Sequence, residues 1–341
     1  MPRTLGVGIL GAGYVAGEHI RAYGNNPHSY VAAIASRTLD KARARAGEFG
    51  LDVPVYAERD ALLANPEVRI VSVCTPNNCH AEDVAAAAAA GKHILIEKPP
   101  AIEVDGLRKM RDAVRRAGVK TLVGFVLRWN PYLLTVKRLL EDGVLGRVVL
   151  AQLDYWHHIS RDDQLPMYHW LVRRETGGSI FLAGGSHAVD AVRWLLDDEV
   201  VEVTAYSGRP AGDYEYAPTT VALLKLAGGA IAKVSACVEA YTPYVFNVEL
   251  LGDMGSIRNE KLYTRKLPGQ RSWATVPANM PDSGDVSHHP FQGEIDHFLE
   301  CIVNDVESPL NLESGVKTTE VCLAADISAA EGRPVRLPLI E

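Results

Sequence analysis

The sequence predicts an α/β fold in two parts, a doubly wound parallel sheet followed by an α+β domain. Three observations support this. A glycine-rich turn joins the first apolar run to a helical segment, strand-length runs then alternate with helical segments to about residue 125, and strand-like runs dominate afterwards. A chain of 341 residues has room for two domains. We therefore expect a first domain at residues 1–125 and a second at residues 126–341.

The first turn has the pattern of a dinucleotide-binding fingerprint. The apolar run from Leu5 opens into Gly11-x-Gly13-x-x-Ala16, and a helical segment extends to Asn25. Gly11 permits a tight turn, Gly13 lets the backbone approach a pyrophosphate, and Ala16 lets helix and strand pack closely. The alternative is a glycine-rich turn that holds no ligand. We expect a Rossmann domain with cofactor contacts at Gly11, Gly13, Tyr14 and Val15.

The end of the second strand bears on the choice of cofactor. The run that starts at Tyr30 ends in Ser36-Arg37-Thr38, where a carboxylate would bind the ribose hydroxyls of NAD. Arg37 can instead pair with a 2′-phosphate, and Ser36 can donate a hydrogen bond. The sequence therefore favours NADP(H), and NAD(H) stays open as the alternative.

A later strand of the first domain also ends in a polar motif. Helical segments at 40–49 and 59–63 precede the apolar run 70–74, which ends in Thr75-Pro76-Asn77 with His80 close behind. Ligands bind at the carboxyl ends of strands in such sheets. We therefore expect cofactor contacts from Thr75, Pro76, Asn77 and His80.

The next strand ends in a charged pair. An Ala-rich helix at 81–90 leads to the strand from His93, which ends in Glu97-Lys98-Pro99. A lysine held near a carboxylate can polarise a carbonyl or exchange a proton with an alcohol. Taken alone, the pair could equally be a surface ion pair. We expect both residues at the cofactor, and Lys98 also at the substrate as a catalytic residue.

The remaining segments predict a different second domain. A helix follows at 101–117 and a strand at 119–124, and Pro131 begins a helix that ends near Glu141. Strand-like runs occur at 147–158, 200–206, 219–226, 230–239 and 245–251. Their hairpin-like spacing indicates an antiparallel sheet.

Composition excludes several classes of protein. The chain is 47% hydrophobic and 23% charged, which does not fit disorder, and its net charge of −7 leaves no basic excess for nucleic acid or an anionic membrane. No apolar run reaches membrane-spanning length. The five cysteines lack disulfide or zinc spacing, so we expect reduced thiols and a cytoplasmic protein.

The ordered motifs resemble the Gfo/Idh/MocA oxidoreductases, which include glucose-fructose oxidoreductase and inositol dehydrogenase. The glycine turn, Thr75-Pro-Asn77, Glu97-Lys98-Pro99 and the later Gly185-x-His187-x-x-Asp190 occur in the family's order. The resemblance implies an open, mostly antiparallel second sheet, a carbohydrate-like substrate and a homo-oligomer, dimer or tetramer.

The resemblance also assigns residues in the second half. It implies that His187 is the catalytic acid/base and that Arg128 lies near the cofactor. A helix from about Gly178 would place positions 183, 187 and 190 on one face. The expected substrate contacts are Lys98, Trp129, His157, His158, Trp170, His187, Asp190 and His289.

One position departs from the family pattern. Polyol-oxidising members commonly carry an aspartate four residues before the histidine, and this chain has Ala183 there. An alanine cannot hold the imidazole or join a proton relay. The candidates for replacing the carboxylate are Asp154, His157, His158 and His289.

Three functions remain open from the sequence. The first is a dehydrogenase that moves hydride between the nicotinamide and a secondary alcohol of a sugar or polyol. The second is a glycosidase or epimerase that oxidises a sugar transiently with tightly held NAD. The third is a nucleotide-binding sensor without turnover, and the presence of both Lys98 and His187 counts against it.

The paired histidines do not predict a metal site. Adjacent histidines such as His157-His158 point to opposite faces of a strand, so no metal site is expected.

Overall fold

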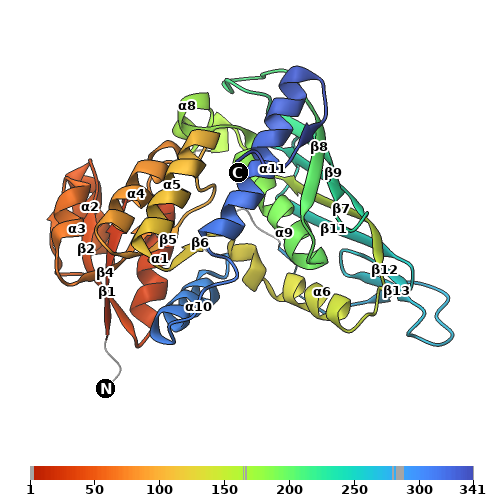
Figure 1. Ribbon diagram of the computed structural model, residues 1–341, viewed down its shortest axis with the longest axis horizontal. Coiled ribbons are helices and arrows are strands. Elements are labelled where there is room, and N and C mark those ends of the chain that lie inside the picture. Colours follow the sequence, from red (N-terminus) through yellow and green to blue (C-terminus); the bar gives the residue numbers. More distant parts are fainter. Residues whose placement is uncertain (1–3, 164, 166, 279, 282–287, 341) are drawn as a thin grey trace. The chain divides into compact units, whose positions relative to one another are not determined.

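The computed structural model describes residues 4–163, 165, 167–278, 280–281 and 288–340, in two compact units (Figure 1). The first unit comprises residues 1–126 and 290–316, and the second comprises residues 127–289 and 317–341. This division differs from the expected single boundary at residue 125, because residues 290–316 return to the first unit. Helix α10 (Phe291–Val303) packs against α1 (Tyr14–Asn25) there.

The first unit contains a six-stranded sheet within the described residues, in the order β3-β2-β1-β4-β5-β6, with every adjacent pair parallel. The strands are β1 (Leu5–Leu10), β2 (Ser29–Ala35), β3 (Val55–Tyr56), β4 (Val68–Val73), β5 (His93–Ile96) and β6 (Thr121–Val123). The helices between them are α1, α2 (Leu39–Glu48), α3 (Arg59–Ala64), η1 (Asn77–Cys79), α4 (His80–Ala89) and α5 (Val104–Ala117). Apolar side chains bury both faces of the central strands, as a parallel sheet covered by helices requires. The predicted doubly wound sheet is confirmed.

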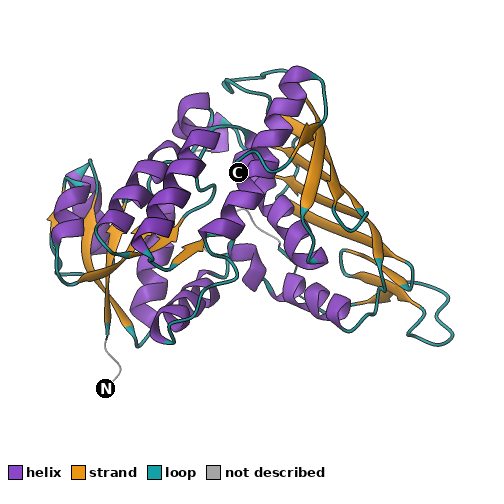
Figure 2. Ribbon diagram, in the orientation of Figure 1, coloured by secondary structure: helices purple, strands orange, loops and turns teal. Residues whose placement is uncertain are grey.

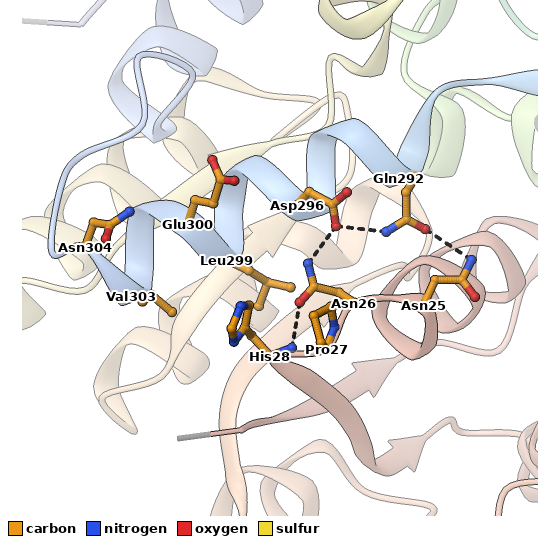
Figure 3. Close-up of a pocket in the computed structure, with 10 residues that line it drawn as sticks. All are labelled: Asn25, Asn26, Pro27, His28, Gln292, Asp296, Leu299, Glu300, Val303 and Asn304. Carbon is orange, nitrogen blue, oxygen red and sulfur yellow. Dashed lines mark hydrogen bonds between the residues drawn. The ribbon is translucent and has the colours of Figure 1, made fainter. Parts of the chain in front are cut away.

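Polar contacts attach α10 to the end of α1. Asn26 Nδ2 and Gln292 Nε2 both donate to Asp296, at 2.7 and 2.8 Å, and Asn25 Nδ2 donates to Gln292 at 3.2 Å (Figure 3). These residues line a pocket of about 680 Å³ at the amino end of β2. Dinucleotide cofactors bind at the carboxyl ends of parallel strands, so this pocket lies at the wrong edge of the sheet for one.

The second unit contains a nine-stranded sheet within the described residues, in the order β14-β13-β12-β11-β7-β10-β9-β8-β15. Only the β7–β10 pair is parallel, which confirms the predicted mostly antiparallel sheet. The strands are β7 (Val148–Trp156), β8 (Val200–Ser207), β9 (Thr219–Leu226), β10 (Ile231–Cys237), β11 (Val245–Gly252), β12 (Gly255–Arg258), β13 (Lys261–Thr264), β14 (Ala274–Thr275) and β15 (Val335–Arg336). The helical segments are η2 (Val126–Trp129), α6 (Pro131–Glu141), η3 (Arg161–Asp163), α7 (Tyr168–Leu171), α8 (Arg174–Gly177), η4 (Phe181–Gly185), α9 (Ser186–Leu196) and α11 (Leu312–Glu331), of which η2 and α11 begin in the first unit. Figure 2 shows α6 and α9 along one face of this sheet.

Alternation along β7 separates two sets of side chains. Ala151 and Leu153 are fully buried, and Tyr155 continues their face onto η4. Asp154 lies on the opposite face, where it accepts hydrogen bonds from Lys233 and Ser235. This face therefore carries the polar residues of the strand.

The segment before α9 is not the regular helix that we expected from Gly178. Phe181–Gly185 forms a π-helical turn, and the α-helix begins only at Ser186. This segment packs closely on β7, where a Cβ at Gly184 would lie 2.4 Å from the Tyr155 ring. Such turns occur often at functional sites. The wider turn also breaks the regular 3.6-residue spacing that we expected from position 183 to position 187.

Candidate active site

The glycine turn of the first unit has the geometry of a pyrophosphate site. Gly11 has a φ of +110°, and a Cβ there would lie 2.4 Å from the Cys74 carbonyl oxygen, so only glycine fits. Gly13 is the N-cap of α1 and has open space where a Cβ would be. The N-cap of this 12-residue helix is a glycine, which has no side chain to cap the first amides, so the amino end of α1 suits an anion. The residues present therefore fit the phosphates of a dinucleotide.

Basic side chains surround this turn. Arg45 on α2 donates to the Gly13 carbonyl at 3.0 Å, and its guanidinium covers Gly17. At the end of β2, Ser36 is partly exposed and Arg37 is exposed. Burial and Asp83 raise the pKa of the Cys79 thiol, and Arg37 opposes that rise, which places the guanidinium near the loop after β4. The positive charge expected at the ribose end of the site is therefore present.

The loop after β4 is anchored by two networks. Thr75 donates to Asp83 at 2.7 Å, and Asn77 is only 4% exposed. His80 is fully buried, with Nε2 2.8 Å from the Thr75 carbonyl oxygen and Nδ1 2.8 Å from that of Pro99. The expectation that the His80 side chain contacts the cofactor is therefore wrong. Both ring nitrogens are used to join the loop after β4 to the loop after β5.

Glu97 and Lys98 follow β5 at the same edge of the sheet. Glu97 is 8% exposed, so the alternative of a surface ion pair is excluded. Its Oε1 lies 3.0 Å from Nε2 of the fully buried His19, and its Oε2 accepts the backbone N–H of Lys98 at 3.2 Å. Both carboxyl oxygens are therefore used within the protein. Lys98 is half-buried, and burial lowers the pKa of its ammonium group while Glu97 opposes that fall.

His187 lies in the second unit, in the first turn of α9, and is 5% exposed. The ring of Tyr155 lies nearly parallel to its imidazole, with 6.3 Å between the ring centroids. The Tyr155 hydroxyl is 3.4 Å from Nδ1 of His157, and Tyr244 packs edge-on against both of these rings at 5.5 Å. His289 lies 6.5 Å from Tyr244. Three of the predicted histidines, at 157, 187 and 289, therefore border one aromatic cluster.

This cluster has little charge. Burial lowers the pKa of His157, an effect that His158 and His289 reinforce and Asp163 opposes. Burial also raises the pKa of the Tyr155 and Tyr244 hydroxyls. A neutral imidazole at His157 and protonated phenols at Tyr155 and Tyr244 therefore make up the cluster that Tyr155 joins to His187. Such groups can donate and accept hydrogen bonds with the hydroxyls of a sugar.

Arg128 and Asp190 form a buried pair in the second unit. Nε and Nη2 of Arg128 each donate to one oxygen of Asp190 at 2.8 Å, and the guanidinium lies over the Trp194 ring. Thr318 also donates to Asp190, at 3.3 Å. The two residues that we expected at the cofactor and at the substrate are thus bonded to each other, which fixes the start of the second unit to α9.

The other predicted residues take separate places. His158 faces Tyr241, with 5.3 Å between ring centroids, and lies 4.0 Å from Asp163. Trp129 ends η2, and Trp170 is half-buried in α7. Asp154 was a candidate for replacing the missing carboxylate, and strand alternation rules it out because it faces away from η4 and α9.

Two features are absent from the described residues. No three histidine, cysteine, aspartate or glutamate side chains among them are placed to hold a metal ion. No helix in the described part of the chain is long and apolar enough to cross a membrane.

Sequence reasoning missed several residues around these motifs. His19 and Glu294 are buried near Glu97, and Tyr244 joins the aromatic cluster. His19 follows Ala16 by three positions on α1, so helical spacing could have placed it on the buried face. Glu294 and Tyr244 depend on contacts with residues far away in sequence, and no local pattern marks them.

The chain combines a Rossmann unit with a second unit that has a mostly antiparallel sheet and a buried histidine. This combination is typical of nicotinamide-dependent oxidoreductases with two domains. Comparison with known families specifies the class further. The model described as "Oxidoreductase family, NAD-binding Rossmann fold" matches residues 5–125, and the "GFO/IDH/MocA C-terminal domain" matches residues 133–258. This chain belongs to the Gfo/Idh/MocA oxidoreductase family.

Similar proteins include two inositol 2-dehydrogenases. The one from Streptomyces avermitilis is 32% identical over 266 residues, which is 76% of this chain and 73% of the relative. The one from Rhizobium meliloti is 27% identical over 344 residues, or 98% and 99% of the two chains. A levoglucosan dehydrogenase, solved in complex with NADH and levoglucosan, has the same fold. Its TM-score is 0.87 at 24% identity, over 98% of this chain and all of the other.

Proposed function

We propose that this oxidoreductase transfers a hydride between a nicotinamide cofactor and a secondary alcohol or ketone of a sugar or polyol. The observation that supports it most is the placement of Lys98. It follows β5 at the carboxyl edge of the sheet that also carries the glycine turn after β1. The inositol 2-dehydrogenases among its relatives make a cyclic polyol the first substrate class to test.

The proposed roles follow from the chemistry of each group. A bound nicotinamide supplies the hydride acceptor or donor. Lys98, as an ammonium group, stabilises the oxygen of the reacting carbon as it gains negative charge. His187, as a neutral imidazole, takes the hydroxyl proton during oxidation and returns it during reduction. His157 and the tyrosines around it hydrogen-bond the remaining hydroxyls and keep water out.

The test is a substrate screen with matched lysine variants. Purified protein is assayed with NAD+ and NADP+ against inositols and pyranoses, by the absorbance of the reduced nicotinamide. Lys98→Met should lower kcat by about 100-fold or more while cofactor affinity falls less than about tenfold. Lys109→Met is the control, because Lys109 pairs with Glu82 on the surface of α5. Near-normal turnover of the Lys98 variant would contradict the assignment.

We also propose that NADP(H) is preferred over NAD(H). Arg37 near Cys79 and the absence of a carboxylate among Ser36-Arg37-Thr38 support this preference. The description of the family model names NAD, and the preference for NADP(H) is proposed for this chain alone. Fluorescence titration with NADPH and NADH tests it, and tighter binding of NADH would overturn it.

A homo-oligomer, dimer or tetramer, is part of the same proposal. Leu150, Val221, Leu223 and Ile231 are 41%, 37%, 52% and 51% exposed, and they share the face of the second sheet that carries Asp154. A second copy would cover this apolar surface. Light scattering of the purified protein measures the state, and a monomer at micromolar concentration would refute the proposal.

A further inference from the structure

Three titratable side chains are buried together in the first unit. His19 on α1 and Glu294 on α10 are fully buried, and Glu97 at the end of β5 is 8% exposed. Helices α1 and α10 pack against each other, and the His19 ring lies 5.3 Å from that of Phe291. The reaction proposed above uses none of these three side chains directly. Buried ionisable groups are costly unless they are paired, so their arrangement needs an explanation.

His19 makes two short contacts that fix its ring. Its Nδ1 lies 2.6 Å from the Ser72 hydroxyl on β4, and its Nε2 lies 3.0 Å from Oε1 of Glu97. A ring protonated at both nitrogens can donate to both oxygens. The contacts therefore tie the helix after the glycine turn to β4 and β5 at once.

Glu97 carries this contact on to Lys98. Its second oxygen, Oε2, accepts the backbone N–H of Lys98 at 3.2 Å. The chain of contacts thus runs from the His19 imidazole through the Glu97 carboxylate to the backbone of Lys98. A shift of the carboxylate would move that backbone and remove a negative charge close to the lysine.

The charge states agree with this geometry. Burial works against a charged ring, but the neighbouring Cys74 and Glu97 outweigh it and raise the pKa of His19 well above its usual value. Burial also works against a charged Glu97, but His19, Lys98 and His80 outweigh it and lower the pKa of that carboxyl. His19 and Glu97 therefore form a buried ion pair.

Glu294 differs from Glu97. Neither of its carboxyl oxygens has a hydrogen-bond partner in the described part of the chain. Burial and the nearby Glu97 raise the pKa of Glu294 well above its usual value, and His19 only partly opposes them. An uncharged acid at this position avoids two adjacent buried anions. The buried cluster consists of His19, Glu97 and Glu294. The other titratable groups that act on it, from every element packed around it, are Tyr23, Cys74, His80 and Lys98.

We propose that His19 is a positioning residue for Lys98, acting through the Glu97 carboxylate, with Glu294 beside them as an uncharged acid. The role of Lys98 rests on the proposed function, whereas the ion pair itself does not. His19 keeps Glu97 ionised and oriented, and Glu97 in turn keeps Lys98 charged. Because burial lowers the pKa of Lys98, losing the anion would deprotonate the lysine at lower pH.

The first test is the pH dependence of kcat/KM. Without the imidazolium, a buried Glu97 takes up a proton, so His19→Gln should move the alkaline limb to lower pH by about one unit. Glu97→Gln should cause a similar shift, and kcat should fall more than KM changes in both variants. Asp296→Asn is the control, because Asp296 lies on α10 and accepts hydrogen bonds from Asn26 and Gln292, outside the contacts between His19, Glu97 and Lys98. An alkaline limb unchanged in both Gln variants would overturn the proposal.

The second test needs no turnover. In protein labelled with ¹⁵N-histidine, the His19 resonances, assigned by their absence from the His19→Gln variant, should show a doubly protonated ring at about pH 8, above the usual histidine pKa. Glu97→Gln should return the ring to the neutral form at that pH. A neutral His19 in the wild-type protein would overturn the proposal even if the enzyme is active. Failure to oxidise any sugar would refute only the proposed function.

Glu294 has its own readout. A carboxyl whose folded pKa is raised stays protonated while the unfolded chain ionises, so it lowers stability as pH rises above about 4.5. Glu294→Gln removes that loss. The Tm of this variant relative to wild type should therefore increase between pH 5 and pH 8. A relative Tm that stays constant over the same range would show that Glu294 is ionised in the folded protein and contradict its uncharged state.

Discussion

The two units surround their key residues with opposite electrostatic environments. In the first unit, Lys98 adjoins Glu97, whose carboxyl group contacts the buried His19 ring. In the second, His187 adjoins Tyr155, which in turn contacts His157, a histidine whose pKa is lowered by burial. The first arrangement holds charge in place, and the second keeps an imidazole among uncharged groups. These are the settings that a charged electrophile and a neutral base require.

The second unit also holds buried charges away from this cluster, and breaking the Arg128–Asp190 pair should have the largest effect on stability. Asp190→Asn leaves a largely buried guanidinium without its anion, so we expect the free energy of unfolding to fall by roughly 3–5 kcal/mol. Urea unfolding of the wild-type protein and of the Asp190→Asn variant measures the loss.

Asp142→Asn is the matched control for that experiment. Asp142 pairs with Arg138 on the exposed side of α6, and such a surface pair contributes about 0–1 kcal/mol. Equal losses in the two variants would mean that the Arg128–Asp190 pair has no structural role beyond that of a surface pair.

The difference between the units also explains what the sequence could predict. In the first unit, the glycine turn, Thr75-Pro-Asn77 and Glu97-Lys98-Pro99 all follow apolar strands, and parallel strands bring such ends to one edge. Strand pattern alone therefore located these loops. What it could not locate was the support behind them, because His80 binds two carbonyl oxygens and Glu294 comes from a distant helix.

The second unit was less predictable for a geometric reason. Helical periodicity put positions 183, 187 and 190 on one face, but the π-helical turn at Phe181–Gly185 changes the spacing. Within the turn, Gly184 fits against the Tyr155 ring from β7, a contact between residues far apart in sequence. Local sequence patterns do not carry information about such packing.

Adding one methyl group at this contact tests the fit, with an intermediate effect. Gly184→Ala places a Cβ 2.4 Å from the Tyr155 ring, and overpacking of this kind costs about 1–3 kcal/mol. Thermal unfolding should show the loss, and adding Tyr155→Leu should recover part of it. Gly47→Ala in α2 meets no atom within 4 Å and should be neutral or slightly stabilising. If both alanine variants are equally stable, the glycine is not required by packing.

The smallest expected effect tests whether His157, in the aromatic cluster of the second unit, is uncharged. Because burial lowers the pKa of His157, the folded protein binds fewer protons there than the unfolded chain between that lowered pKa and about 6.5. Stability contributed by a neutral His157 is therefore complete above about pH 6.5 and decreases as pH falls through this window. His157→Asn removes this dependence, so the stability of wild type relative to the variant should decrease on acidification, by at most about 1.4 kcal/mol for each pH unit that the window spans. Urea unfolding at several pH values measures the difference. A relative stability that increases on acidification would mean that His157 is charged in the folded protein, and the two units would then not differ in the way described.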